Sequence, residues 1–203
     1  MRTFVLISVC AVPFLWVFFR AIFSALCDRN YFGADPGMEL VIFFGQAAIL
    51  FLFLTLSFNH LRGVTKILGV PRMRRILGLT VFSYATLHLL SYLIFLTGLE
   101  LENYFHDLIT KKRIIFGSLA YFLLFLLAAT SIDSVVRNLG RVWLHLHRLV
   151  YLIAGLVVVH VFLSAKENFS YALFLLFAYL LLLSVRIEKA RRKSKFGPRI
   201  SRA

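Results

Sequence analysis

Long apolar segments alternate with short polar ones along nearly the whole chain. A helix rises about 1.5 Å per residue, so a bilayer core of about 30 Å needs roughly 17 to 25 residues to cross it. Six segments reach or approach that length, which predicts six transmembrane helices. They are Phe4 to Leu26, Glu39 to Phe58, Ile76 to Leu99, Ile114 to Ile132, Leu149 to Ala165 and Phe169 to Ile187.

The composition indicates the same class of protein. Hydrophobic residues make up 61% of the 203 residues, and 22 of them are Phe, which is far from the balance of an ordinary soluble domain. The loops are short and contain no glycine pattern typical of nucleotide or nicotinamide binding. We therefore expect an all-α integral membrane protein, folded as a six-transmembrane-helix bundle.

The basic residues predict the orientation of the bundle, because Lys and Arg accumulate in cytoplasmic loops. Most of them lie before the first segment, after the second, after the fourth and after the sixth. We expect both termini in the cytoplasm, with a transmembrane domain at residues 1–187 and a basic cytoplasmic tail at residues 188–203. Positive-inside loops and contact with anionic membrane lipid explain the formal net charge of +14, so we expect no nucleic-acid partner.

Two histidines, His88 and His160, lie deep inside the third and fifth segments. An ionisable group at that depth is costly unless it meets another protein group, a cavity or a cofactor. The helical rise places His88 about 20 Å beyond Arg75 and His160 about 18 Å beyond Arg148. The two side chains should therefore share one depth, in the outer half of the bilayer. This predicts a bis-histidine haem b between the two helices.

Polar neighbours on the third segment would complete such a pocket. Tyr84, Ser91 and Tyr92 share a helical face with His88 and offer hydrogen bonds and aromatic walls. The plainer interpretation is that each buried histidine only hydrogen-bonds to a neighbouring helix. Both interpretations stay open for a single histidine, whereas two at matched depth favour the haem.

A second group of candidate residues lies at the cytoplasmic ends of the third and fifth segments. Its members are His145, His147, Arg74, Arg75 and Arg148. Guanidinium groups suit carboxylates and phosphates, so this end could hold haem propionates, a second haem, a flavin phosphate or a quinone, although anchoring at the inner surface explains the arginines nearly as well. His147 and His160 differ by a rotation of about 220° on an ideal helix, so they face one pocket only if the helix bends or begins after His147.

Five motifs carry a resemblance to a known family. They are GADP at Gly33 to Pro36, RRILGL at Arg74 to Leu79, ATLHLLSY at Ala85 to Tyr92, LGRVWLHLHRLVY at Leu139 to Tyr151, and the later His160. In this order and spacing the chain resembles the MsrQ family of haem-binding membrane subunits, part of the ferric-reductase-like transmembrane family. The resemblance covers nearly the whole chain.

The resemblance implies a function in the bacterial inner membrane. A six-helix bundle with b-type haem would pass electrons from quinol to MsrP, a periplasmic molybdopterin enzyme that reduces methionine sulfoxide in oxidised proteins, and would form a heterodimer with it. His88, His147 and His160 match the family's three haem-associated histidines. FMN is also implied, although we find no local motif for it. Whether the chain is itself an enzyme, or the electron-transfer subunit of one, stays open.

The resemblance also suggests where the periplasmic partner would dock. The segment Gly33 to Pro36 is typical of a turn, because Asp35 can bond to local backbone before the proline. With the family in view it becomes a candidate docking surface. The other members of that surface are Glu100, Glu102, Asp107 and the cluster Lys111 to Arg113.

Two other functions stay open. A stand-alone ferric reductase of the same superfamily would reduce chelated iron without a molybdoenzyme. A proton-coupled transporter would use the buried histidines as relays, but no Asp or Glu lies mid-segment to pair with them. A complete second bis-histidine haem is not supported. A second pair would need a histidine 13 or 14 residues before His88, and those positions are Arg75 and Arg74.

Overall fold

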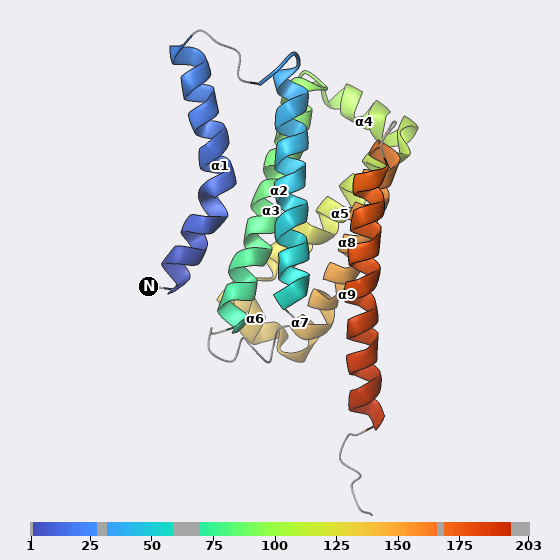
Figure 1. Ribbon diagram of the computed structural model, residues 1–203. Helices are drawn as coiled ribbons and strands as arrows, with labels where there is room; N and C mark the ends of the chain where they lie inside the picture. The colour runs from blue at the N-terminus through green and yellow to red at the C-terminus, as the bar shows by residue number, and fades with distance from the viewer. Residues whose placement is uncertain (1, 28–31, 59–69, 166–168, 196–203) are drawn as a thin grey trace, which may run out of the picture.

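The computed structural model describes residues 2–27, 32–58, 70–165 and 169–195, and these residues form helices and turns without a strand. The elements are α1 (Arg2–Leu26), α2 (Pro36–Phe58), α3 (Val70–Phe95), α4 (Leu101–Thr110), α5 (Lys112–Ala129), α6 (Asp133–Leu139), α7 (Arg141–Leu146), the 3₁₀ turn η2 (His147–Leu149), α8 (Val150–Ser164) and α9 (Ser170–Lys195). Figure 1 shows them as an elongated bundle.

The six predicted transmembrane segments are confirmed, since six helical stretches within the described ranges are long and apolar enough to cross a membrane. Some boundaries differ from the prediction. The third helix ends at Phe95 rather than Leu99, because Gly98 and Leu99 have φ angles of 66° and 64°, which a right-handed helix does not adopt. The last helix continues past Ile187 to Lys195. Residues 196–203 of the predicted tail lie outside the described residues.

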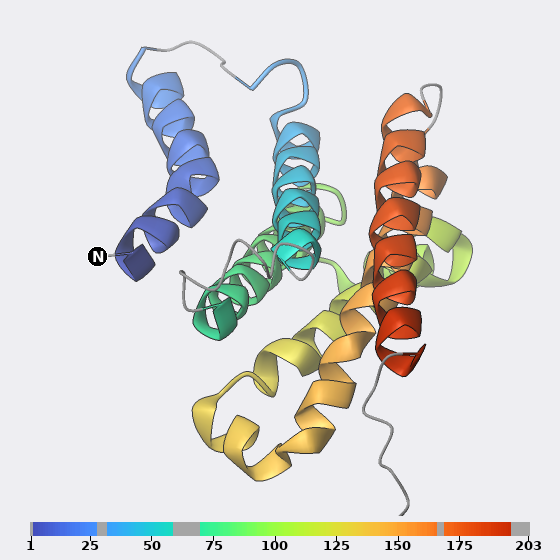
Figure 2. The same ribbon diagram turned by 60° about the horizontal axis from the view of Figure 1, so that its bottom comes forward.

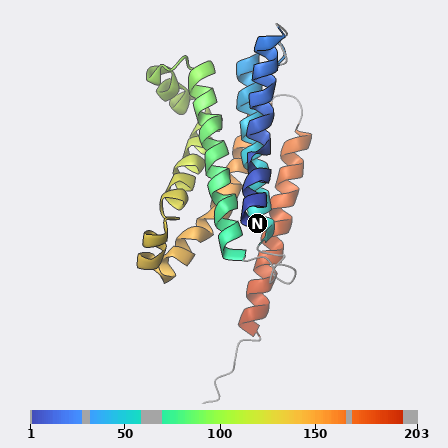
Figure 3. The same cartoon turned by 90° about the vertical axis from the view of Figure 1, so that its left-hand side faces the viewer.

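Four helices form the centre of the molecule (Figures 1 and 2). α2 pairs with α3, α5 pairs with α8, and the two pairs face each other through the contacts of α3 with α5 and of α2 with α8. α9 packs along α8. Figure 3 shows α4 at one end of α5 and α6 at the other. We call these the α4 end and the α6 end of the bundle.

The core lies where these helices meet, and apolar side chains also cover the outside. Phe51 on α2, Leu77 on α3 and Ile153 on α8 are almost fully buried. On the outward faces large apolar side chains are exposed, among them Trp16 at 59% and Phe177 at 68%. A surface this apolar suits contact with lipid tails rather than water, which agrees with a multi-pass membrane protein.

α1 stands apart from the other helices and is held by few contacts (Figure 1). The Tyr84 hydroxyl donates to the Cys10 carbonyl at 2.7 Å and accepts from the Phe14 N–H at 3.1 Å. The Phe14 N–H and the Cys10 carbonyl are the two groups that bond to each other in a regular helix, so Tyr84 contacts both partners of one backbone position of α1, next to Pro13. An Arg20–Glu39 ion pair of 2.8 Å adds a second link, to α2.

Candidate functional site

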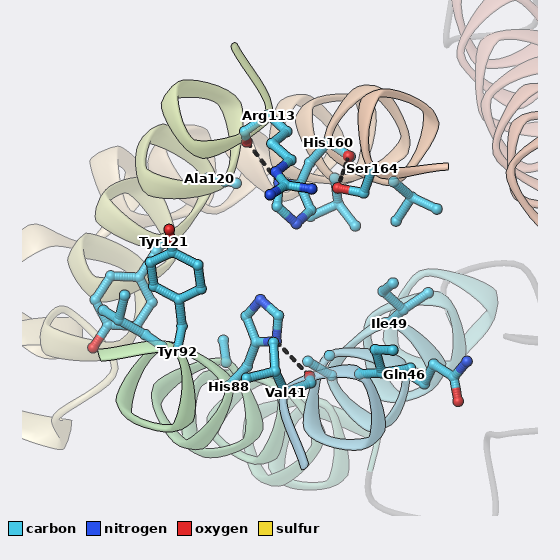
Figure 4. A pocket seen from close by; sticks show the side chains of 18 of the residues that line it. Val41, Gln46, Ile49, His88, Tyr92, Arg113, Ala120, Tyr121, His160 and Ser164 are labelled. Atoms are coloured by element: carbon cyan, nitrogen blue, oxygen red, sulfur yellow. Dashed lines mark hydrogen bonds between the residues drawn. The ribbon is translucent and has the colours of Figure 1, made fainter. Parts of the chain in front are cut away.

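A cavity of about 580 Å³ lies between α2, α3, α5 and α8. His88 enters it from α3 and His160 enters it from α8. Figure 4 shows the two imidazoles pointing toward each other across the cavity, each with one ring nitrogen facing the gap. Most other wall residues are apolar. The structure therefore brings together the two histidines that the sequence placed at one depth.

Each imidazole is oriented by a backbone carbonyl of the neighbouring helix. Nδ1 of His88 lies 2.7 Å from the Val41 oxygen, and Nδ1 of His160 lies 2.7 Å from the Arg113 oxygen. A carbonyl oxygen only accepts hydrogen bonds, so each Nδ1 carries a hydrogen and donates. Nε2 of the neutral ring then keeps its lone pair, which is the form that binds a metal.

Glycines allow the two rings to lie this close to the neighbouring helix. A Cβ atom at Gly45 would lie 2.9 Å from Nδ1 of His88, and one at Gly117 would lie 2.8 Å from Nδ1 of His160. Real Cβ atoms essentially never come so close to another atom, so a larger residue would displace the imidazole. Both glycines are thus required by a close approach.

The two halves of the site repeat one arrangement. In each half the residue whose carbonyl accepts the hydrogen bond precedes the histidine by 47 residues. In each half the glycine follows that carbonyl by one helical turn, so Val41, Gly45 and His88 correspond to Arg113, Gly117 and His160. The pairs α2–α3 and α5–α8 therefore build equivalent half-sites that face each other.

The geometry of the pair fits a shared metal ion. The ring centroids of His88 and His160 are 6.2 Å apart and the ring planes are at 89°. A metal–imidazole bond is about 2.0–2.1 Å, so two imidazoles on opposite sides of one metal ion have centroids roughly 6 Å apart. Within the described parts of the chain no group of three or more His, Cys, Asp or Glu side chains could hold a metal ion. The described chain thus presents two facing imidazoles as candidate metal ligands.

The α4 end of the cavity is polar. The Tyr104 and Ser118 hydroxyls are 2.7 Å apart, and the Tyr92 hydroxyl donates to Asp107 on α4. The Lys111 ammonium lies 2.6 Å from the same carboxylate. Lys111 first, and Tyr92 second, hold the pKa of Asp107 below its ordinary value. This network joins α4 to the ends of α3 and α5.

Of the three residues predicted to share a helical face with His88, one lines the cavity and two do not. Tyr92 is part of the wall, whereas Tyr84 and Ser91 are not among the lining residues. Tyr84 instead binds α1 and stacks on Phe51, with ring centroids 5.4 Å apart. Ser91 is buried, at 6% exposure.

His147 is not brought to the histidine pair. It lies in η2 at the α6 end, where its Nε2 is 3.4 Å from the Ser131 hydroxyl and its ring stacks on Trp143 at a centroid distance of 4.0 Å. α8 begins at Val150, after His147, yet His147 does not line the cavity between His88 and His160. His145 is exposed and bonds to the Arg141 carbonyl at 3.0 Å.

The three arginines predicted near His147 also lie at the α6 end, each in a different setting. Arg75 pairs with Asp133. Arg74 interacts electrostatically with His147, and Arg148 is exposed. None of the three lines the cavity between His88 and His160.

Sequence reasoning missed three contributors to the site, Gly45, Gly117 and the inward-pointing side chain of Arg113. The repeated interval between carbonyl, glycine and histidine was the signal that could have found the glycines. Arg113 was predicted as part of a docking surface, but Figure 4 shows its guanidinium inside the cavity beside His160.

Comparison with known proteins agrees with this architecture. The family described as "Ferric reductase like transmembrane component" matches residues 43–158. The chain is 36% identical over 192 residues to the "Protein-methionine-sulfoxide reductase heme-binding subunit MsrQ" of Polaromonas naphthalenivorans, covering 91% of this chain and 85% of the relative. Proteins of the same name from an Enterobacter species and from Klebsiella pneumoniae are 36% and 34% identical, over 76% and 89% of this chain and 75% and 88% of theirs.

The fold and the paired histidines define a multi-pass membrane protein of the ferric-reductase-like class. The relatives match over most of the chain, which narrows the assignment from this class to one family. The chain belongs to the MsrQ family, as its motifs suggested.

Proposed function

We propose that this protein is a membrane electron-transfer subunit in which His88 and His160 are the axial ligands of a b-type haem. The observation that carries the proposal is the pair of imidazoles with centroids 6.2 Å apart and both Nδ1 atoms committed to backbone carbonyls. The described chain offers no third ligand for a simple metal site, which favours a metal held in a macrocycle. The relatives are named heme-binding subunits.

In this proposal the protein supplies position and environment. A bound haem would contribute a one-electron ferric/ferrous couple. The Val41 and Arg113 carbonyls hold the two imidazoles in the tautomer that leaves Nε2 free to bind a metal. Most of the cavity walls around both rings are apolar.

The finer part of the proposal concerns the donor and the acceptor. The names of the relatives place them in a methionine sulfoxide reductase system, and we infer that this chain carries electrons from quinol to a periplasmic molybdopterin partner, MsrP, across the bacterial inner membrane. FMN, and roles for His147, Arg74, Arg75 and Arg148 in binding a cofactor or quinone, remain predictions. The flavin is tested by its fluorescence after the purified protein is denatured.

The experiment that tests the haem is a dithionite-reduced minus oxidised spectrum of the detergent-purified protein with a pyridine haemochrome count. His88→Ala and His160→Ala should each abolish the low-spin b-type spectrum. The exposed His145→Ala is the matched control and should leave it unchanged. A wild-type protein without haem, expressed with ample haem supply, would contradict the proposal. A haem count that falls from two to one in His147→Ala would reveal a second haem at the α6 end.

The acceptor is tested with proteoliposomes that contain the haem-loaded protein. Haem reduced by quinol should be reoxidised when MsrP and a protein methionine sulfoxide are added together, and not when either is omitted. Reoxidation by chelated ferric iron alone would favour the stand-alone ferric reductase.

A further inference from the structure

The cavity around the two histidines has one apolar end and one polar end. On the α6 side of the histidines, four buried apolar side chains form a layer. Each lies seven residues along its helix from one of the two histidines or one of the two glycines, Gly45 and Gly117. They are Leu52, Val81, Leu124 and Ile153, all at most 7% exposed. Seven residues correspond to about 10 Å of helix. At this layer a ligand that fills the cavity meets hydrocarbon. Between the layer and Gly117, Tyr121 also lines the cavity, with its hydroxyl 3.2 Å from the Thr86 hydroxyl.

A second layer lies one helical turn from the same histidines and glycines in the other direction, toward α4, and three of its four side chains are polar or charged. Its four positions are Val41, Tyr92, Arg113 and Ser164, all lining the cavity. The equivalence of the two half-sites makes Arg113 the counterpart of Val41, so only one half carries a cation here. Figure 4 shows the Arg113 side chain directed into the cavity over His160.

The charge on Arg113 is not balanced by the protein in the ranges that the structure describes. None of the ion pairs found there includes Arg113, and Asp107 at the same end is already bound by Lys111 and Tyr92. Arg113 also lies in the first turn of α5, which contains no acidic residue. The helix dipole is positive there, and an unpaired cation inside a membrane span is costly.

We propose that Arg113 binds a carboxylate of the haem, which would then lie with its propionate edge toward α4 and its apolar edge toward Leu52, Val81, Leu124 and Ile153. The inference rests on the proposed function, since it needs a haem between His88 and His160. It replaces the prediction that the arginines at the α6 end hold the propionates. A guanidinium fork matches a carboxylate and binds it in two parallel hydrogen bonds.

The test measures haem affinity in the full-length protein, purified haem-free after haem-limited expression and titrated with haemin. Arg113→Gln should weaken haemin binding by about tenfold or more, and Arg113→Lys should restore part of the loss. Lys112→Gln removes an exposed charge from the same helical turn and should leave the affinity unchanged. Every variant is first required to give one symmetric peak in size-exclusion chromatography.

A second ligand separates a carboxylate contact from a general effect on the fold. Haemin dimethyl ester keeps the iron and the ring but has no free carboxylate. Arg113→Gln and wild type should bind the ester with equal affinity, and both complexes should show the low-spin spectrum of two imidazole ligands. Equal loss for haemin and for its ester would overturn the proposal.

Two further results would also contradict it. One is an Arg113→Gln protein that binds haemin as tightly as Lys112→Gln. The other is a loss of haemin affinity, with the ester unaffected, in Arg74→Gln or Arg75→Gln instead, which would place the propionates at the α6 end. Failure of the proposed function looks different, because the wild type would then bind neither haemin nor its ester.

Discussion

At the scale of single residues, the site depends on the absence of a Cβ atom at two glycines as much as on the two histidines. Gly45 and Gly117 each leave room for an imidazole that a Cβ atom would meet at 2.9 Å or 2.8 Å. The imidazole position in turn decides whether Nδ1 reaches its carbonyl. Alanine at either glycine therefore acts on the imidazole of the neighbouring helix rather than on its own helix.

Gly45→Ala and Gly117→Ala should each reduce haem content by several-fold and shift the low-spin spectrum, because the imidazole must move to admit the methyl group. Gly78→Ala is the matched control, since an added Cβ at Gly78 on α3 meets nothing within 4 Å. It should keep full haem content and stabilise its helix by up to about 1 kcal/mol. Haem content per protein and the visible spectrum measure the effect, and equal spectra in all three variants would contradict it.

Asp107 gives the α4 end a stability that depends on pH. Its pKa in the folded protein is held below the ordinary value of 3.8, chiefly by Lys111. The ionised form is therefore favoured by folding, and this contribution is fully present above the unfolded pKa. It is lost as the pH falls below 3.8 and through the folded pKa.

Asp107→Asn should lower the thermal unfolding midpoint in detergent by about 2–4 °C at neutral pH. The difference from wild type should shrink as the pH is lowered below 3.8, where the wild-type carboxyl loses its charge. Melting curves from pH 7 to pH 3 measure it. Glu102→Gln, which changes an exposed acid on the same helix, is the control, and a difference that stays constant with pH would show that the Asp107 charge is not responsible.

At the scale of helices, the hydropathy pattern predicted the long elements and missed the short ones. A bilayer fixes the length of an apolar segment, so all six spans were visible in the sequence. α4, α6 and α7 have 10, 7 and 6 residues, too few to produce such a signal. The positive φ angles of Gly98 and Leu99 that end α3 depend on local backbone packing, which hydropathy does not report.

The attachment of α1 to the bundle is another property that the hydropathy pattern does not predict. Tyr84→Phe removes the hydroxyl that contacts Cys10 and Phe14, while the ring can still stack on Phe51. One net hydrogen bond contributes about 1 kcal/mol, so α1 should separate from the bundle on the order of fivefold more often. The buried Cys10 thiol should then react faster with a membrane-permeant maleimide.

That reaction is measured in a Cys27→Ser background, because Cys27 is exposed and would react first. Tyr121→Phe is the matched control. It also loses a hydroxyl contact, to Thr86 at 3.2 Å, but it does not touch α1. Equal Cys10 reactivity in wild type and Tyr84→Phe would show that the hydroxyl does not hold α1.

At the scale of the whole molecule, the sequence could place His88 and His160 at one depth because depth follows from helical rise alone. It could not show that Arg113 points inward, since that depends on how α5 rotates against α8. The rotation of about 220° argued against His147 joining the pair on a straight helix, but only the structure shows that His147 stays apart even though α8 begins after it. Depth is a one-dimensional property, whereas the faces that helices turn toward each other are set by packing.

The orientation of the bundle in the membrane links this site to its proposed partner. The described ends of α1 and α9, Arg2 and Lys195, lie on the side away from α4 (Figure 1). If both termini are cytoplasmic, as the basic residues predict, the α4 end faces the periplasm. His160 is four residues, or about 6 Å, from the end of its helix at Ser164. The site would thus lie close to the surface that a periplasmic acceptor can reach.

Fusions to the full-length chain test this orientation. Green fluorescent protein at the C-terminus should be fluorescent, because it matures in the cytoplasm, and alkaline phosphatase inserted after Glu100 should be active, because it needs the periplasm. The opposite pattern would place the α4 end in the cytoplasm. The haem site would then lie far from a periplasmic acceptor, and transfer to MsrP would require a further carrier near His147 at the α6 end.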